Sequence, residues 1–205
     1  MQKRKKDPDP MLRGEIHSVD PILGKKVIRP LMVDTMLKEI KRGIFRHAVE
    51  TIRRNIFEGK LDEAHAIESE LPIMYPGVTT HEDHPELMEV NGLAVVNMRF
   101  MSLADATEAL EHLRAWPFVK AYFHNVRGSL LVLVYLGLDF TGEADFFEQR
   151  QHLIDLMNKA LPRVHFSCRK RIARGFMASY DPQCFCRPDE EVETFINHME
   201  SLVSR

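Results

Sequence analysis

The sequence predicts a mixed α+β fold, in which a single domain of helices and strands follows a short N-terminal arm. Between Gly92 and Pro182 the apolar residues switch between the two-residue repeat of strands and the longer repeat of helices. The chain has 205 residues, enough to bury a hydrophobic core within one domain. Residues 1–31 are rich in charge, Pro and Gly, so we expect a flexible or strap-like arm there and the domain over residues 32–205.

The first helical pattern covers Val33–Phe57, which we interpret as one continuous helix. A second, shorter helix is expected from Leu61 to Leu71, where Pro72 stops it. On an ideal helix over the first segment, four cationic side chains fall within an arc of about 80°: Lys38, Arg42, Arg46 and Arg53. This stripe either follows a nucleic-acid backbone or is an ordinary solvated helix face.

The central pattern begins with a buried strand over Leu93–Met98. Ser102 is expected to open a helix, with Asp105 as its capping partner three residues later. Pro117 ends this helix, and Phe118–His124 alternates again as a second strand.

The second half of the central pattern repeats this order. Residues Asn125–Ser129 form a turn, and the apolar run Leu130–Leu136 predicts a central strand covered on both faces. A helix follows Thr141 and ends at Pro162, and Arg174–Tyr180 is expected to supply the last strand. The resulting β-α-β-β-α-β order is typical of ferredoxin-like and RRM-like folds.

A final helix is expected near the C-terminus, with Asp189 as its cap. Its apolar stripe predicts that it packs on the sheet, a partner surface being the alternative: the stripe comprises Val192, Phe195, Ile196, Met199 and Leu202.

Composition limits the classes of function. The formal net charge is -2, so nucleic-acid binding requires a local basic patch. Three cysteines without a signal peptide fit a reducing cytoplasm, and no apolar run is long enough for a membrane span. We therefore expect a cytoplasmic protein without a membrane partner, and the sequence indicates no cofactor.

Three phrases in this order resemble the N-terminal domain of virulence-associated protein E. They are Leu71-Pro72, the strand start Gly92-Leu93-Ala94-Val95-Val96, and Arg174 followed by Ser179-Tyr180-Asp181-Pro182. The resemblance covers roughly Glu50 to Pro188. It implies a primase-like domain, related to archaeo-eukaryotic primases, of a replication-associated protein from a bacterial mobile element.

The resemblance also implies where metal-binding acids should stand. The family's Asp-x-Asp at a strand end aligns with Asn97 and Arg99, and a third acid aligns with His165. Residues two apart on a strand lie about 6.6 Å apart on the same face, so two carboxylates there can hold the paired metals of phosphoryl transfer. Asparagine is a poor metal ligand compared with a carboxylate, and arginine repels a divalent cation. We therefore expect that the fold is retained and that these catalytic positions are vestigial.

Two metal sites can be considered. His81 and His84 lie in the predicted loop Pro72–Pro85, where no helix brings them together. A zinc set would require the last strands to be adjacent: its ligands would be His165, Cys168, Cys184 and Cys186. Buried cysteines that act as small hydrophobic residues are the alternative, and we expect no metal.

A basic group is expected around the open end of the sheet, either binding phosphates or pairing with the many acidic residues: Arg99, Arg127, Arg169, Lys170, Arg171 and Arg174. The chain lacks the G-x-S-x-G and P-loop motifs. In the central strand only Tyr135 could stack on bases, which does not support RRM-type readout.

We conclude from the sequence that the chain is a catalytically degenerate primase-like domain that binds nucleic acid, a nucleotide or a replication partner. The alternatives are an active nucleotidyl transferase, whose acids would be Asp105, Asp139 or Asp181, and a pure protein-interaction module.

Overall fold

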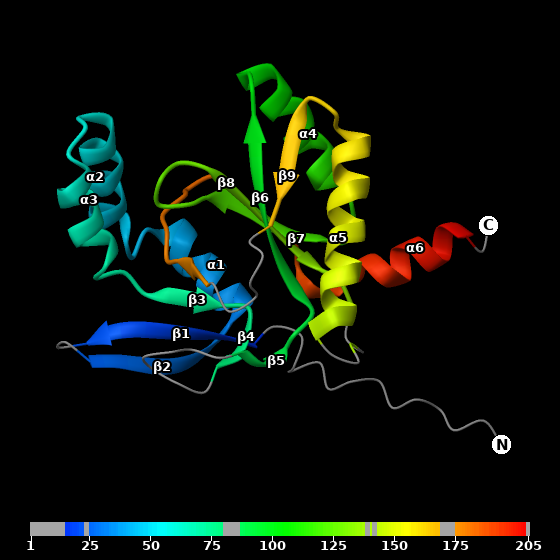
Figure 1. Cartoon of the computed structure of the whole chain (residues 1–205), viewed down its shortest axis with the longest axis horizontal. Helices are drawn as coiled ribbons and strands as arrows, with labels where there is room; N and C mark the ends of the chain where they lie inside the picture. The colour runs from blue at the N-terminus through cyan, green and yellow to red at the C-terminus, as the bar shows by residue number, and fades with distance from the viewer. Residues whose placement is uncertain are drawn as a thin grey trace.

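The computed structural model describes residues 15–22, 25–79, 87–137, 140, 143–168 and 175–203. Its helices and strands form a mixed α+β fold with antiparallel sheets (Figure 1). In chain order the elements are β1 (Glu15–Ile22), β2 (Lys25–Met32), α1 (Val33–Arg42), α2 (Arg46–Phe57), α3 (Leu61–Glu68), β3 (Ile73–Tyr75), β4 (Gly77–Thr79), β5 (Leu87–Val90), β6 (Leu93–Phe100), α4 (Leu103–Ala115), β7 (Val119–His124), β8 (Leu130–Tyr135), α5 (Glu143–Ala160), β9 (Val164–Ser167), β10 (Phe176–Met177), β11 (Phe185–Cys186), a 3-10 turn (Asp189–Glu191) and α6 (Phe195–Val203).

The larger sheet has the strand order β11-β7-β8-β6-β9, with every neighbouring pair antiparallel. Side chains alternate between its two faces, so each strand contributes to two cores. One face packs with residues of α4 and α5, among them Ala109, Leu153 and Met157. All six residues of β8 are buried, as expected of a strand with both faces covered.

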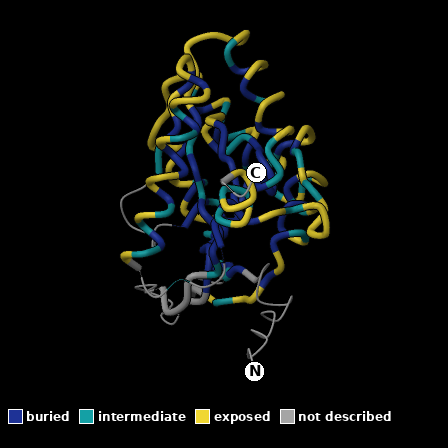
Figure 2. The backbone as a smooth tube through the Cα atoms, turned by 90° about the vertical axis from the view of Figure 1, so that its right-hand side faces the viewer, coloured by how far each residue is buried: buried dark blue, intermediate teal, exposed yellow. Residues whose placement is uncertain are grey.

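The opposite face of the larger sheet packs against α1 and a second sheet with the strand order β10-β3-β1-β2. Met36 and Ile40 of α1 belong to this second core, together with Phe123 of β7 and Leu131 of β8. In Figure 2 the buried backbone forms a continuous central layer between exposed helices. The fold is therefore layered, with α4 and α5 on one side of the sheet and α1 with the smaller sheet on the other.

Helices α2 and α3 form a separate pair beside the larger sheet (Figure 1). Val49 and Ile52 of α2 pack against Ala64, Leu71 and Val126, the last of which lies in the turn between β7 and β8. This small core joins the helical pair to the β7–β8 turn.

The expected arm differs from the structure. Residues 15–22 and 25–31, which were expected to belong to a flexible or strap-like arm, form β1 and most of β2, and β1 also pairs with β3. The prolines had argued against strands, but Pro30 lies in the edge strand β2, where a missing N–H is tolerated. Residues 1–14 lie outside the described residues.

The continuous helix predicted over Val33–Phe57 is wrong. The chain leaves α1 at Gly43, which has a φ of 82° and donates its N–H to the carbonyl oxygen of Glu39. This is the left-handed conformation that glycine adopts at helix ends. Helix α2 then begins at Arg46, so the predicted cationic stripe is divided between two helices.

The last strand of the central pattern is also not where it was expected. The strand that pairs with β6 is β9, directly after α5, whereas residues 176–177 of the expected Arg174–Tyr180 strand form β10 in the smaller sheet. Asp189 opens only a 3-10 turn; the hydroxyl of Thr194 accepts the N–H of Asn197 at the start of α6. Phe195 packs into the first core, which confirms that α6 docks on the domain.

Candidate nucleic-acid interface

A row of polar side chains lies at the β6–β9 pair of the larger sheet. We call Asn97, Arg99, His165 and Ser167 the polar strip. In the antiparallel register Arg99 is opposite His165, and Asn97 is opposite Ser167. Cβ atoms of directly opposite residues are about 4.5–5.5 Å apart, so the side chains of the strip are neighbours.

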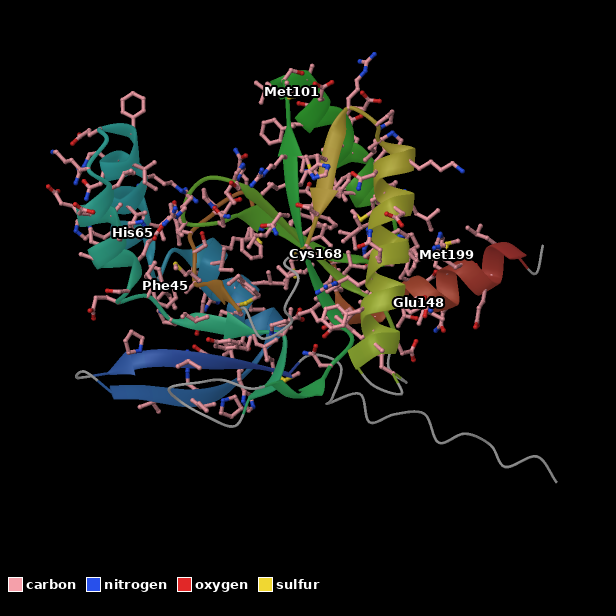
Figure 3. All side chains as sticks on the ribbon, in the orientation of Figure 1. Phe45, His65, Met101, Glu148, Cys168 and Met199 are labelled. Carbon is pink, nitrogen blue, oxygen red and sulfur yellow. The ribbon has the colours of Figure 1, made fainter. Side chains whose placement is uncertain are left out.

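The strip lies on the sheet face away from α4 and α5. Ala94, Val96 and Met98 pack with those helices, so Asn97 and Arg99 point to the other side by alternation. Exposure increases along β6 toward Arg99, which is exposed like His165, while Asn97 and Ser167 are half-buried. Figure 3 marks Met101 just beyond the end of β6 to which the strip leads.

No residue that β6, β8 or β9 presents on this face carries a carboxylate, and all of these positions are described. The structure therefore brings together the three positions at which the resemblance implies acids: Asn97, Arg99 and His165. A guanidinium, an imidazole and an amide can donate hydrogen bonds to phosphate oxygens. The strip is suited to an anion, and Ser167 is a member that the sequence did not reveal.

The predicted basic helix does not form one surface. Lys38 and Arg42 are exposed on α1, while Arg46 on α2 donates to Glu50 at 2.9 Å and lies over the Tyr180 ring. Arg53 has a structural role.

The guanidinium of Arg53 is half-buried and donates to the carbonyl oxygens of Asn125 at 2.8 Å and Tyr180 at 3.1 Å. Burial lowers the pKa of Arg53, and the nearby carboxylate of Asp181 acts against this shift. Arg53 thus joins α2 to the β7–β8 turn and to the segment after β10.

Arg127 is also held by an acidic partner. Its guanidinium donates two hydrogen bonds, of 2.7 and 2.6 Å, to the buried carboxylate of Glu68, and lies 3.2 Å from Nδ1 of His65. The hydrogen bond to Glu68 raises the pKa of Arg127. The other predicted cations, Arg169, Lys170, Arg171 and Arg174, lie outside the described residues, as do His81 and His84.

The four residues considered as a zinc set cannot share one ion. His165 and Cys168 lie at β9, whereas Cys184 and Cys186 lie at β11, and these strands form opposite edges of the larger sheet. Three strands lie between them, which corresponds to about 19 Å at the usual strand spacing. Cys184 is buried, and burial raises the pKa of its thiol to about 12.

The Ser179-Tyr180-Asp181-Pro182 phrase has a structural role that the sequence did not reveal. One carboxylate oxygen of Asp181 accepts hydrogen bonds from the main-chain N–H of His124 at 2.8 Å and from its ring Nδ1 at 2.9 Å. The Ser179 hydroxyl donates to the carbonyl oxygen of His124 at 2.7 Å. These contacts fix the end of β7 to the segment after β10.

Lys120 provides a second buried polar contact. Its fully buried ammonium group lies 2.6 Å from carboxylate oxygens of both Asp34 and Asp189, and it donates to the carbonyl oxygen of Arg187 at 2.6 Å. Burial alone lowers the pKa of Lys120, but the two carboxylates outweigh it, so the pKa is raised. Lys120 thereby joins α1 and the C-terminal segment to β7.

Comparisons with models of protein families, with curated proteins and with solved structures found no match. Within the described residues, no group of three or more His, Cys, Asp or Glu side chains is arranged to hold a metal ion. No helix in the same part of the chain has the length and apolar character needed to cross a bilayer.

Proposed function

We propose that this chain is a catalytically inactive, primase-like domain that binds the phosphates of a single-stranded nucleic acid at the polar strip. The opposition of Arg99 and His165 across β6 and β9 carries this proposal. A guanidinium can engage two phosphate oxygens at once, and the imidazole beside it supplies a further donor. Asn97 and Ser167 extend the row of hydrogen-bonding groups along the strand pair.

The arrangement of the strands supports a ferredoxin-like core. The segment from β6 to β9 has the order β-α-β-β-α-β, its strands are ordered β7-β8-β6-β9, and α4 and α5 share one face. The smaller sheet and α1 cover part of the opposite face, whereas Arg99 and His165 are exposed at the end of β6 and in β9, where a ligand can reach them. We infer that the primase-like scaffold has been kept and used for binding.

The absence of carboxylates from the strip argues for binding without phosphoryl transfer. Two metal ions that act on a phosphodiester need acidic ligands, and Arg99 would repel a divalent cation. Of the acids considered for an active enzyme, Asp105 accepts a hydrogen bond from Ser102 at the start of α4. Asp181 is occupied by His124, and Asp139 lies outside the described residues.

Fluorescence anisotropy with a labelled single-stranded DNA oligonucleotide, in EDTA and at low salt, tests the proposal. We expect saturable binding that weakens as salt rises, because phosphate contacts release counterions. Arg99→Ala should weaken binding about tenfold, which corresponds to the loss of one charge-assisted hydrogen-bonding partner. Lys159→Ala, which removes an exposed cation from α5 on the other face, should bind as the unmodified protein does.

Two outcomes would overturn the proposal. Template-dependent primer synthesis with Mg²⁺ or Mn²⁺ would identify an active enzyme instead. A lack of nucleic-acid binding, or binding that does not depend on salt, would leave the protein-interaction module, with a replication protein as a candidate partner.

A further inference from the structure

Arg150 is a buried cation in the middle of α5. Only 7% of the residue is exposed, and its Nε atom is buried without a hydrogen-bond partner. The centre of the guanidinium lies 4.6 Å from the centroid of the Phe147 ring and 5.8 Å from that of Phe146. The aromatic rings cover the planar faces of a guanidinium in such contacts and leave its N–H edges to bind something else.

Among the residues that the structure describes, Arg150 forms no ion pair with a carboxylate. Burial lowers the pKa of Arg150, and the electrostatic interaction with Cys168 acts in the opposite direction. A buried charge without a partner is costly, and protein interiors usually supply a counter-charge. The aromatic contacts replace only part of the lost hydration, so the site would gain from an added anion.

Cys168 packs against the same hydrophobic core as Phe146 and Phe147, the two rings that contact Arg150. It follows Ser167 at the end of β9 and is half-buried beside α5 (Figure 3). Burial raises the pKa of its thiol, and the Arg150 guanidinium acts in the opposite direction. A thiol next to a guanidinium can donate a further hydrogen bond to an oxyanion, since S–H is a weak donor.

We propose that Arg150 and Cys168 form a binding site for a phosphate group, separate from the polar strip. A phosphate supplies the missing negative charge and several acceptor oxygens, which suit the N–H edges of the guanidinium. The phosphate belongs either to a small molecule or to a nucleic acid. Cys168 packs with the core on the α4–α5 side, whereas the polar strip lies on the opposite face of the sheet. A substitution at one site should therefore leave binding at the other site unchanged.

Thermal unfolding of the full chain in increasing inorganic phosphate, with ionic strength held constant by chloride, tests the site. The unmodified protein should gain Tm, because a ligand that binds only the folded state stabilises it. Arg150→Met should lose this response and be at least as stable without phosphate, because an apolar side chain replaces a buried charge that pairs with no carboxylate of the described residues. Arg163→Met, at an exposed arginine after α5, is the matched control and should respond as the unmodified protein does.

Alkylation of Cys168 gives a readout that needs no variant. Peptide mapping after maleimide treatment should show Cys168 modified about threefold more slowly at a phosphate concentration of twice Kd. Exposed Cys186 provides the internal control, since its rate should not change. Parallel measurements with a mononucleotide and with a short oligonucleotide show whether the phosphate belongs to a small molecule or to a nucleic acid. The compound that resembles the natural ligand should bind more tightly than inorganic phosphate, and the other should not.

Equal phosphate responses of the unmodified protein and Arg150→Met would overturn the site, as would an unchanged alkylation rate of Cys168. Acetate that protects Cys168 as well as phosphate does would overturn the assignment to phosphate. Loss of oligonucleotide binding in Arg99→Ala with the phosphate response intact would confirm that the two sites are independent.

Discussion

Arg99 of β6 and His165 of β9 are direct cross-strand partners in the larger sheet. They occupy positions at which the resemblance implies acids, although they lie far apart in the sequence. The antiparallel register makes the two side chains neighbours on one face. A cation and an imidazole therefore meet where a metal site would require negative charge.

The close approach of Gly92 to Gly137 makes a sharp test of the fold around β6. Gly92 has a φ of 75°, and a Cβ there would lie 1.8 Å from the carbonyl oxygen of Gly137. We expect Gly92→Ala to destabilise the protein by more than about 3 kcal/mol, because main chain must move in addition to the strain at positive φ. Urea unfolding measures this change.

Gly59→Ala is the matched control for the Gly92 variant. Gly59 has a φ of 77°, but a Cβ there would meet nothing within 4 Å. The expected loss is about 1 kcal/mol, from backbone strain alone. Equal losses in the two variants would contradict the close approach between Gly92 and Gly137.

Asp181 should stabilise the folded protein at neutral pH and lose this contribution at low pH. Burial alone raises its pKa, but hydrogen bonds from His124 and from the N–H of Gln183 outweigh it, so the pKa is lowered. A carboxyl group with a lowered folded-state pKa stabilises the fold above its unfolded pKa of about 3.9, and this contribution is lost as pH falls through the folded value.

Asp181→Asn tests this contribution. We expect a loss of about 2 kcal/mol at pH 7, because the amide does not replace the charged acceptor. The loss should begin to shrink below about pH 4, where the unfolded chain takes up a proton at this carboxyl group, and should vanish as pH falls through the lower folded-state pKa. Free energies of unfolding measured from pH 3 to pH 7 check the prediction, and a loss that stays constant over that range would contradict it.

Lys120→Met should destabilise the junction between α1, β7 and the C-terminal segment. The substitution leaves Asp34 and Asp189 without their shared cation. The carboxylates retain 35% and 52% exposure, so we expect the lower end of the range for breaking a buried pair, about 3 kcal/mol, by urea unfolding. Lys159→Met on exposed α5 should change stability by less than about 0.5 kcal/mol, and a similarly small effect at Lys120 would refute its role.

The sequence was sufficient for the central elements because their signals are local. The Ser102 hydroxyl accepts the N–H of Asp105 as the capping pattern predicted, and Pro117 follows the end of α4. The six-residue apolar run of β8 is likewise a strand. Each of these features depends on a few consecutive residues, so the local sequence was enough to predict it.

The features that the sequence did not predict depend on long-range contacts. Pro30 is an unfavourable residue for a strand, so β2 was not expected; it forms next to β1, which also pairs with β3. The residues considered as zinc ligands are not brought together, because the strand order, which the sequence leaves open, separates β9 from β11. Nothing in the sequence indicated that Arg150 is buried, since an arginine within a helix usually faces solvent.

Within the candidate site, the resemblance singled out Asn97, Arg99 and His165, and the register of β6 and β9 places these residues side by side. Ser167 was missed because the last strand was expected at Arg174–Tyr180.

The salt dependence of oligonucleotide binding by Arg99→Ala tests the central claim most directly. If Arg99 neutralises one phosphate, the slope of log K against log salt concentration should decrease in magnitude by about 0.7 for a single strand. Arg99→Lys should preserve the slope, and so should Lys159→Ala. A slope in Arg99→Ala equal to that of the unmodified protein would contradict phosphate binding at the polar strip.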